Sequence, residues 1–114
     1  MKTKKTVAGD YCAIFVTAGS RPEARRIARA LLERRLVACA NIIPGVESHY
    51  WWEGKVDHAR EWLLVMKTRR DQFRAVELAV KQLHSYQVPE IIALPLIAGQ
   101  ADYLRWMDAS LTGK

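Results

Sequence analysis

The sequence predicts an α+β domain whose strands and helices follow the order β-α-β-β-α-β-α. Short apolar runs rich in strand-forming residues alternate with segments whose apolar residues recur at helical spacing. The chain has 114 residues, the size of one ordinary domain, and 50% of them are apolar or aromatic while 26% are charged. These proportions fit a soluble globular domain and exclude a disordered tail, a collagen-like repeat or a coiled-coil rod.

The first two predicted elements are a buried strand and an amphipathic helix. Residues Tyr11–Thr17 form a short apolar run between polar residues, which is typical of a buried strand. Ser20 and Glu23 have the spacing of a capping box, and Pro22 fits the first helical turn because its missing N–H has no partner there. The helix then runs to about Arg35. Its apolar stripe consists of Ala24, Ile27, Ala28, Leu31 and Leu32.

A hairpin is predicted next. The outgoing strand covers Val37–Ile43, is interrupted by Pro44 and Gly45, and resumes over Val46–Trp52. A tight turn at Glu53–Lys55 leads to a returning strand at Arg60–Thr68, which is apolar on both faces and is therefore covered on both.

The length and the aromatic content of this hairpin predict an oligomer. Residues 37–53 number 17 and would span roughly 55 Å at about 3.3 Å per residue. A domain of this size has a radius of gyration of only about 13 Å, so the hairpin must bend sharply or overhang its own domain. Its far half carries four large aromatic residues that a monomer seldom leaves exposed, and we expect a second copy of the chain to cover them. They are Tyr50, Trp51, Trp52 and Trp62.

The remaining elements complete a ferredoxin-like split βαβ arrangement. Asp71 is expected to cap a helix that extends to about His84, with an inward face of Phe73, Val76, Val80 and Leu83. The fourth strand, Ile91–Ile97, contains Pro95, which favours an edge position. A final helix covers about Ala101–Leu111, with Tyr103, Leu104 and Met107 expected to point inward. The first six elements predict an antiparallel sheet with two helices on one face.

Charge and cysteine content limit the partners and the compartment. The net charge is +6, and the whole excess lies in residues 1–35, where we expect a flexible basic tail (residues 1–9) before a single domain (residues 10–114). The arginines carry no interleaved aromatic residues, so no nucleic-acid partner is expected. No apolar run approaches a membrane span and no signal peptide is visible, which predicts a cytoplasmic protein. Cys12 and Cys39 are too few for a disulfide scaffold and are expected to be buried free thiols.

The sequence contains no catalytic motif, and we predict that the protein is not an enzyme. A Gly-x-Ser-x-Gly motif and a glycine-rich phosphate loop are both missing, and Cys39 lies within a predicted strand. His49, His58 and His84 form no short chelate spacing, although a site shared between distant residues or subunits would escape this test. The richest cluster is His84–Glu90, where a His, a Tyr and a carboxylate follow a helix. Its polar groups either bind a ligand or cap the helix end.

Several sequence strings together resemble the CutA family of divalent-cation tolerance proteins. The resemblance covers about residues 10 to 111. The strings that carry it are Ala38–Gly45, Tyr50–Lys55, Lys67–Thr68, Tyr86–Ile91 and Tyr103–Trp106.

The resemblance implies a ferredoxin-like protomer in a tight trimer, similar in architecture to the PII signalling proteins, with the hairpin reaching a neighbour. It also implies that several recurrent residues meet in an inter-subunit cleft as a ligand site. They are Cys39, Trp52, Lys67, Tyr86, Glu90 and Tyr103. In some members a Cys at the position of Val16 and a His at that of Leu83 are proposed copper ligands together with His84, so that His84 alone remains as a metal ligand here.

Two functions of different classes follow from this resemblance. The first is a trimeric module that binds or responds to copper and other divalent metals in cation homeostasis, without catalysis and with no obligatory cofactor. The second is a PII-like sensor in which the inter-subunit cleft binds a small anionic ligand through Lys67.

Overall fold

The computed structural model describes residues 8–113 of the chain. The elements in chain order are η1 (Ala8–Asp10), β1 (Tyr11–Ala18), α1 (Arg21–Glu33), β2 (Cys39–Trp52), β3 (Lys55–Arg69), η2 (Arg70–Gln72), α2 (Phe73–Leu83), β4 (Ile92–Pro95) and α3 (Ala101–Thr112). The first seven residues of the predicted basic tail lie outside the described residues. Its last two belong to the 3-10 turn η1.

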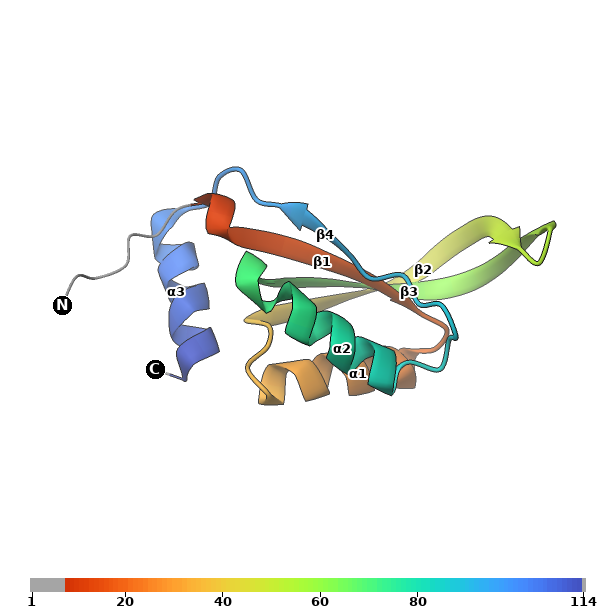
Figure 1. Ribbon diagram of the computed structural model, residues 1–114, viewed down its shortest axis with the longest axis horizontal. Helices are drawn as coiled ribbons and strands as arrows, with labels where there is room; N and C mark the ends of the chain where they lie inside the picture. Colours follow the sequence, from red (N-terminus) through yellow and green to blue (C-terminus); the bar gives the residue numbers. More distant parts are fainter. Residues whose placement is uncertain (1–7, 114) are drawn as a thin grey trace.

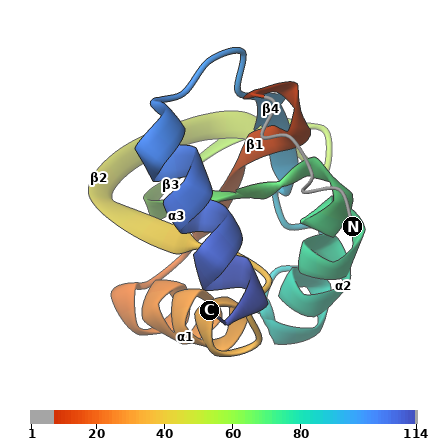
Figure 2. The same ribbon diagram turned by 90° about the vertical axis from the view of Figure 1, so that its left-hand side faces the viewer.

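The four strands form one antiparallel sheet in the order β2-β3-β1-β4. Helices α1 and α2 lie side by side on one face of this sheet, and α3 lies across its end (Figures 1 and 2). This arrangement confirms the predicted ferredoxin-like α+β fold, in which two helices cover one face of an antiparallel sheet. Strand β4 lies at the edge, as Pro95 predicts, and is shorter than the predicted Ile91–Ile97.

The β2–β3 hairpin extends well beyond the helices that cover the rest of the sheet (Figure 1). The molecule measures 55 × 26 × 22 Å and has a radius of gyration of 15.3 Å, against about 13 Å for a compact chain of this length. The register shifts by one residue between Ile43 and Val46, which forms a bulge where Gly45 has a φ of +74°. The predicted interruption at Pro44-Gly45 is therefore a bulge within one continuous strand, and the hairpin both bends and overhangs.

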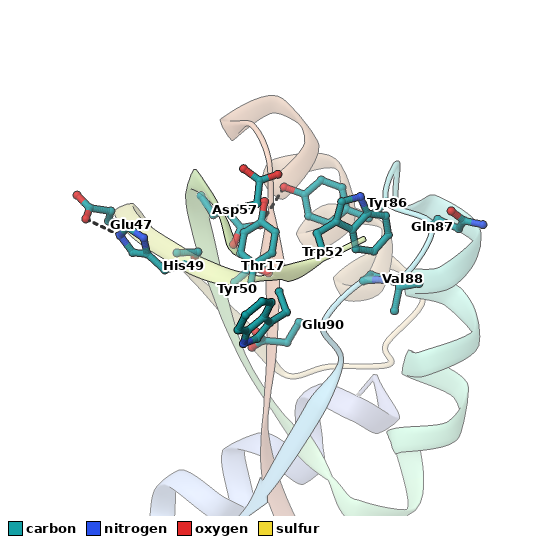
Figure 3. A pocket seen from close by; sticks show the side chains of 14 residues that line it. Thr17, Glu47, His49, Tyr50, Trp52, Asp57, Tyr86, Gln87, Val88 and Glu90 are labelled. Carbon is teal, nitrogen blue, oxygen red and sulfur yellow. Dashed lines mark hydrogen bonds and ion pairs between the residues drawn. The ribbon is translucent and has the colours of Figure 1, made fainter. Parts of the chain in front are cut away.

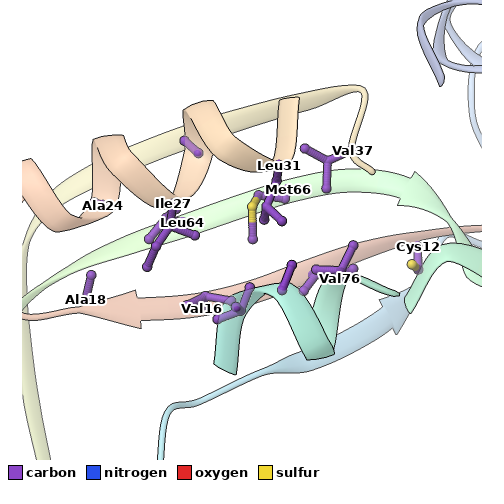
Figure 4. Close-up of a cluster of buried hydrophobic side chains, with 14 residues drawn as sticks. Cys12, Val16, Ala18, Ala24, Ile27, Leu31, Val37, Leu64, Met66 and Val76 are labelled. Carbon is purple, nitrogen blue, oxygen red and sulfur yellow. The ribbon is translucent and has the colours of Figure 1, made fainter. Parts of the chain in front are cut away.

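The core lies between the sheet and helices α1 and α2 (Figure 4). Leu64 and Met66 of β3 are fully buried against Ile27 and Leu31 of α1 and Val76 of α2. The outward residues of β3, such as Leu63 and Val65, are only partly buried, so within one chain the second face of this strand is not fully covered.

A second, smaller cluster is built beneath α3, where Leu104 and Met107 pack with Tyr11 and Ala38. The Tyr11 hydroxyl donates to Asp108 Oδ2 at 2.8 Å, and Arg69 Nη1 donates to Asp108 Oδ1 at 2.9 Å. These contacts attach α3 to the end of the sheet.

Some details differ from the predictions. Asp71 does not cap α2, because it lies inside η2 with its carboxylate 3.9 Å from Arg69 Nε, and α2 begins at Phe73 without a side-chain cap. Leu32 and Tyr103 were expected to be buried, but both side chains are partly solvent-exposed, because the buried stripe of each helix is narrower than the sequence suggests. Cys39 is only half-buried, unlike the fully buried Cys12.

Candidate functional site

A cleft of about 840 Å³ lies between the hairpin and the loop that follows α2 (Figure 3). The hairpin contributes β2 residues 47–52 together with Asp57 and Glu61 of β3, and the loop contributes residues 86–90. The overhang of the hairpin creates this cleft, because the strands continue past the helices while the loop returns along them to β4. Two elements distant in sequence thus form its opposite walls.

The lining of the cleft combines negative charge with aromatic rings. Its carboxylates are Glu47, Asp57, Glu61 and Glu90. Its aromatic residues are Tyr50, Trp51, Trp52 and Tyr86. In a chain whose net charge is +6, this local acidity favours a cationic occupant, both by charge and by the negative faces of the rings.

Tyr86 and Glu61 join the two walls of the cleft. The Tyr86 hydroxyl donates to Glu61 Oε2 at 2.8 Å, and Glu61 is only 6% exposed. Burial, and then the hydrogen bond to the Glu61 carboxylate, raise the pKa of Tyr86, so that the phenol remains a donor at neutral pH. A side chain at position 19 would place its Cβ 3.0 Å from this hydroxyl, so Gly19 makes room for the ring.

Glu90 lies at the other end of the same loop segment and also lines the cleft. Burial, and then the nearby Glu61 charge, raise the pKa of its carboxyl. A cation placed near Glu90 and Glu61 would offset this repulsion, which is consistent with the acidic character of the cleft.

His84 anchors the start of the loop from inside the fold. Its Nδ1 accepts a hydrogen bond from the Tyr86 backbone N–H at 3.0 Å, and its Nε2 lies 2.7 Å from the Thr17 carbonyl oxygen. Since a carbonyl only accepts, Nε2 carries the proton and the ring is the neutral Nε2–H tautomer. Both ring nitrogens are thus engaged with backbone groups, and a metal at either nitrogen would have to break one of these bonds.

The neighbouring Glu23 holds the same loop by a second contact. Its carboxylate accepts a hydrogen bond from the Ser85 N–H at 2.7 Å, while its own backbone N–H donates to the capping Ser20 Oγ at 3.3 Å. The predicted cap at Ser20 is therefore present, but the Glu23 carboxylate turns to the loop. Burial raises the pKa of Glu23, but the hydrogen bonds from Ser85 outweigh it and the net pKa is lowered.

The predicted ligand residues fall into two groups within one chain. Trp52, Tyr86 and Glu90 line the cleft. Cys39 and Tyr103 instead lie in contact near α3, with Sγ 3.5 Å from the phenol oxygen, and the thiol contact together with burial raises the pKa of Tyr103 to about 12. The third member of this second group is Lys67, the cross-strand partner of Cys39, whose Nζ donates to Asn41 Oδ1 at 2.8 Å.

Neither group forms a complete metal site. Within residues 8–113, no three His, Cys, Asp or Glu side chains converge so as to hold one metal ion. Val16 is fully buried in the core and Leu83 packs against it, so these two positions beside His84 are apolar here. The meeting of all six ligand residues in an inter-subunit cleft stays a prediction.

Two features of the hairpin were missed in the sequence, namely its cleft-lining carboxylates and a cross-strand histidine pair. The carboxylates of Glu47, Asp57 and Glu61 line the cleft, and His49 lies directly opposite His58 on the neighbouring strand. The signal that could have revealed them is the two-residue turn at Glu53-Gly54, because it fixes which residues of the two strands face each other.

The fold and the cleft together define a class of protein: a ferredoxin-like domain with an overlong hairpin and an acidic, aromatic cleft at its base. Within the described chain, no helix has the length and apolarity needed to cross a membrane. The family model described as CutA1 divalent ion tolerance protein matches residues 12–110. The chain therefore belongs to the CutA1 family.

Relatives and solved structures agree with this assignment. A divalent-cation tolerance protein CutA of Archaeoglobus fulgidus is 45% identical over 98 residues, which cover 86% of this chain and 95% of the relative. One of Thermus thermophilus is 47% identical over 94 residues, which cover 82% and 91%. The solved structure of the Archaeoglobus fulgidus protein superimposes with a TM-score of 0.86 at 44% identity, covering 89% of this chain and 98% of that one.

The names of the relatives differ in the compartment that they state. The solved Archaeoglobus fulgidus protein is described as periplasmic. A rice relative described as chloroplastic is 44% identical over 97 residues, which cover 85% of this chain and 55% of the relative. For the present chain, a cytoplasmic location stays a prediction from its composition.

Proposed function

We propose that this protein binds or responds to divalent metals, copper among them, and acts in cation homeostasis without catalysis. The observation that carries this proposal is the family match over residues 12–110, together with relatives named for divalent-cation tolerance. The acidic lining of the cleft supports it, because four carboxylates attract cations into a space also walled by aromatic rings.

We further propose that the working unit is a homotrimer. Trp51 is 75% exposed and Val56 is 64% exposed on a hairpin that overhangs its own domain. The exposed side of the sheet also carries the half-exposed Ile43 and Leu94. Monomeric proteins rarely leave apolar residues gathered in this way, and a neighbouring copy would cover them. Assembly also offers a means of completing a metal site for which one chain lacks a third ligand.

Three measurements test these proposals. Sedimentation equilibrium of dilute protein should give about three times the chain mass of 13.0 kDa, and a well-folded monomer would contradict the trimer. Isothermal titration with CuCl₂ in a non-coordinating buffer should show saturable binding. A cell strain that lacks its own family member should regain growth on copper when it expresses this chain. Failure of this rescue by a well-expressed protein would contradict the role in tolerance.

The alternative of an anionic-ligand sensor receives no support from the cleft. Lys67, the expected anion contact, is hydrogen-bonded to Asn41 and does not line the cleft, whose own charged side chains include four carboxylates. Lys67→Ala, tested in a thermal-shift screen of anionic metabolites, remains the experiment for this prediction.

A further inference from the structure

The two exposed histidines of the hairpin form a cross-strand pair. His49 of β2 and His58 of β3 are direct partners in the antiparallel register. Their rings are stacked, with centroids 5.8 Å apart and planes inclined by 30°. The side chain of His49 is 58% exposed within one chain, so no other part of the same chain closes the pair off. Side chains of directly opposed residues lie on one face of the sheet.

The hairpin fixes this pair rigidly. The strands are joined by a two-residue turn in which Glu53 and Gly54 have φ values of +51° and +78°, the pattern of a type I′ turn. Ladder pairing continues on both sides of the two histidines, from Glu47 opposite Arg60 to Trp52 opposite Lys55. Two ligands held by paired strands lose little freedom when they bind one ion, which favours chelation.

Glu47 orients one of the two rings. Its Oε2 lies 2.8 Å from His49 Nε2, and in Figure 3 the two side chains extend together away from Tyr86. Histidines that bind metals commonly donate their second ring N–H to a carboxylate, which fixes the tautomer and leaves the other nitrogen free to coordinate. With Nε2–H donated to Glu47, the lone pair of His49 is on Nδ1. Within the described residues, no side chain or backbone hydrogen bond engages Nδ1 of His49 or the ring of His58.

The ring separation fits a shared metal. With metal–nitrogen bonds of about 2.0–2.1 Å and about 1.1 Å from each nitrogen to its ring centre, the two centroids lie about 6.4 Å apart for a linear arrangement and about 4.5 Å apart at a right angle. The observed 5.8 Å lies within this interval. Because the rings are stacked and not aimed at one point, binding also requires rotation about the side-chain bonds of the two histidines.

We propose that His49 and His58 bind one divalent transition-metal ion per chain, with Glu47 as a positioning residue and water completing the coordination. Imidazole nitrogens suit Cu²⁺, Zn²⁺ and Ni²⁺, and the general order of affinity places Cu²⁺ first. This inference rests on the proposed function, because it assumes that the protein binds a divalent metal and says where. The metal is placed on the hairpin and not at the buried His84. His49 and Glu47 also line the cleft, but the proposed ligands are imidazole nitrogens and not the carboxylate oxygens of the cleft, which are harder ligands.

The test is a titration of the full chain with CuCl₂ and ZnCl₂ in a non-coordinating buffer at pH 7.5. We expect one ion per chain, with Cu²⁺ bound more tightly than Zn²⁺. Either His49→Gln or His58→Gln should weaken Cu²⁺ binding by about tenfold or more, and the double variant should lose little beyond that, because removal of one ligand already destroys the chelate. Glu47→Gln should cause a smaller, few-fold loss. Glu33→Gln removes one exposed negative charge from α1, outside the hairpin and the cleft. It is the matched control and should bind nearly as the parent does.

The outcomes separate this inference from the proposed function. The side chains of Glu33, Glu47, His49 and His58 are all exposed within one chain, so circular dichroism should show unchanged folding. Sedimentation of each variant checks that the assembly of the parent is kept, because the hairpin is also the proposed contact between copies. Parent-like copper affinity in both single histidine variants would overturn the hairpin site while leaving metal binding intact elsewhere. A parent that binds neither ion would also overturn it. If the histidine variants lose binding and still restore copper tolerance in cells, the site exists but the tolerance function does not depend on it.

Discussion

Replacement of His84 by alanine should destabilise the fold severely, because the ring connects two segments of the backbone from a buried position. The side chain has no exposed surface. Its loss removes the partner of the Thr17 carbonyl and the partner of the Tyr86 N–H. Each buried polar group left without a partner costs about 1–3 kcal/mol, and the lost packing of the ring adds about 1 kcal/mol. Partial entry of water offsets some of this, so we expect a loss of about 3–5 kcal/mol.

The assay is urea unfolding followed by circular dichroism, with the free energy of unfolding compared at one protein concentration. His49→Ala is the matched control, because its side chain is 58% exposed and surface substitutions usually change stability by less than about 0.5 kcal/mol. His84→Gln should recover part of the loss, since an amide can both donate to Thr17 and accept from Tyr86. A cost below about 1 kcal/mol for His84→Ala would refute the structural role and would leave His84 available as the predicted metal ligand.

Three further predictions concern the same hairpin and loop. Tyr86→Phe should lower the free energy of unfolding by about 1.5–3 kcal/mol in urea unfolding, since the buried Glu61 carboxylate loses its hydrogen bond; a change within error would contradict this. Because the folded-state pKa of Glu23 is lowered, its contribution is present above the unfolded value of about 4.3 and is lost as pH falls through the folded value. Glu23→Gln should therefore flatten the stability profile measured below about pH 4.5, and an unchanged slope would argue against it. Glu53→Gly should raise stability by about 0.5–1 kcal/mol in thermal unfolding, because Glu53 has a φ of +51°; a decrease would show that its side chain makes a stabilising contact.

The fold could be predicted from the sequence because each element carries a local signal of its own. The helix cap at Ser20, the apolar periodicity of α1 and the bulge at Pro44-Gly45 depend only on neighbouring residues. The start of α2 was predicted incorrectly because the local signal there is misleading. Asp71 resembles a cap locally, but the 3-10 turn at Arg70–Gln72 places it near Arg69 instead. Two local arrangements compete here, a helix cap and a 3-10 turn with an ion pair to Arg69, and the spacing of residues does not show which one forms.

The candidate site was less predictable because it depends on contacts between distant segments. The cluster His84–Glu90 was recognised as important, but its role in orienting the loop emerges only from the bonds of His84 to Thr17 and of Glu23 to Ser85. Glu61 gave no signal in the sequence, since a single carboxylate within a strand is ordinary, and its burial beside Tyr86 follows from the meeting of hairpin and loop. The resemblance to the CutA family named Trp52, Tyr86 and Glu90, all of which line the cleft.

The histidine pair is intermediate between the predictable fold and the less predictable site. Its two members are distant in sequence, but the register of the hairpin fixes that they face each other. Once Glu53 and Gly54 are taken as a two-residue turn, every ladder pair near it is fixed by counting outward, and His49 then faces His58. A search for short chelate spacings along the chain misses such a pair, since its two members are nine positions apart. The geometry is nevertheless as strongly specified as a helical His-x-x-x-His, because a one-residue slip of the hairpin would move the apolar Leu64 and Met66 out of the core. The burial that fixes the sheet therefore also holds the two exposed rings opposite each other.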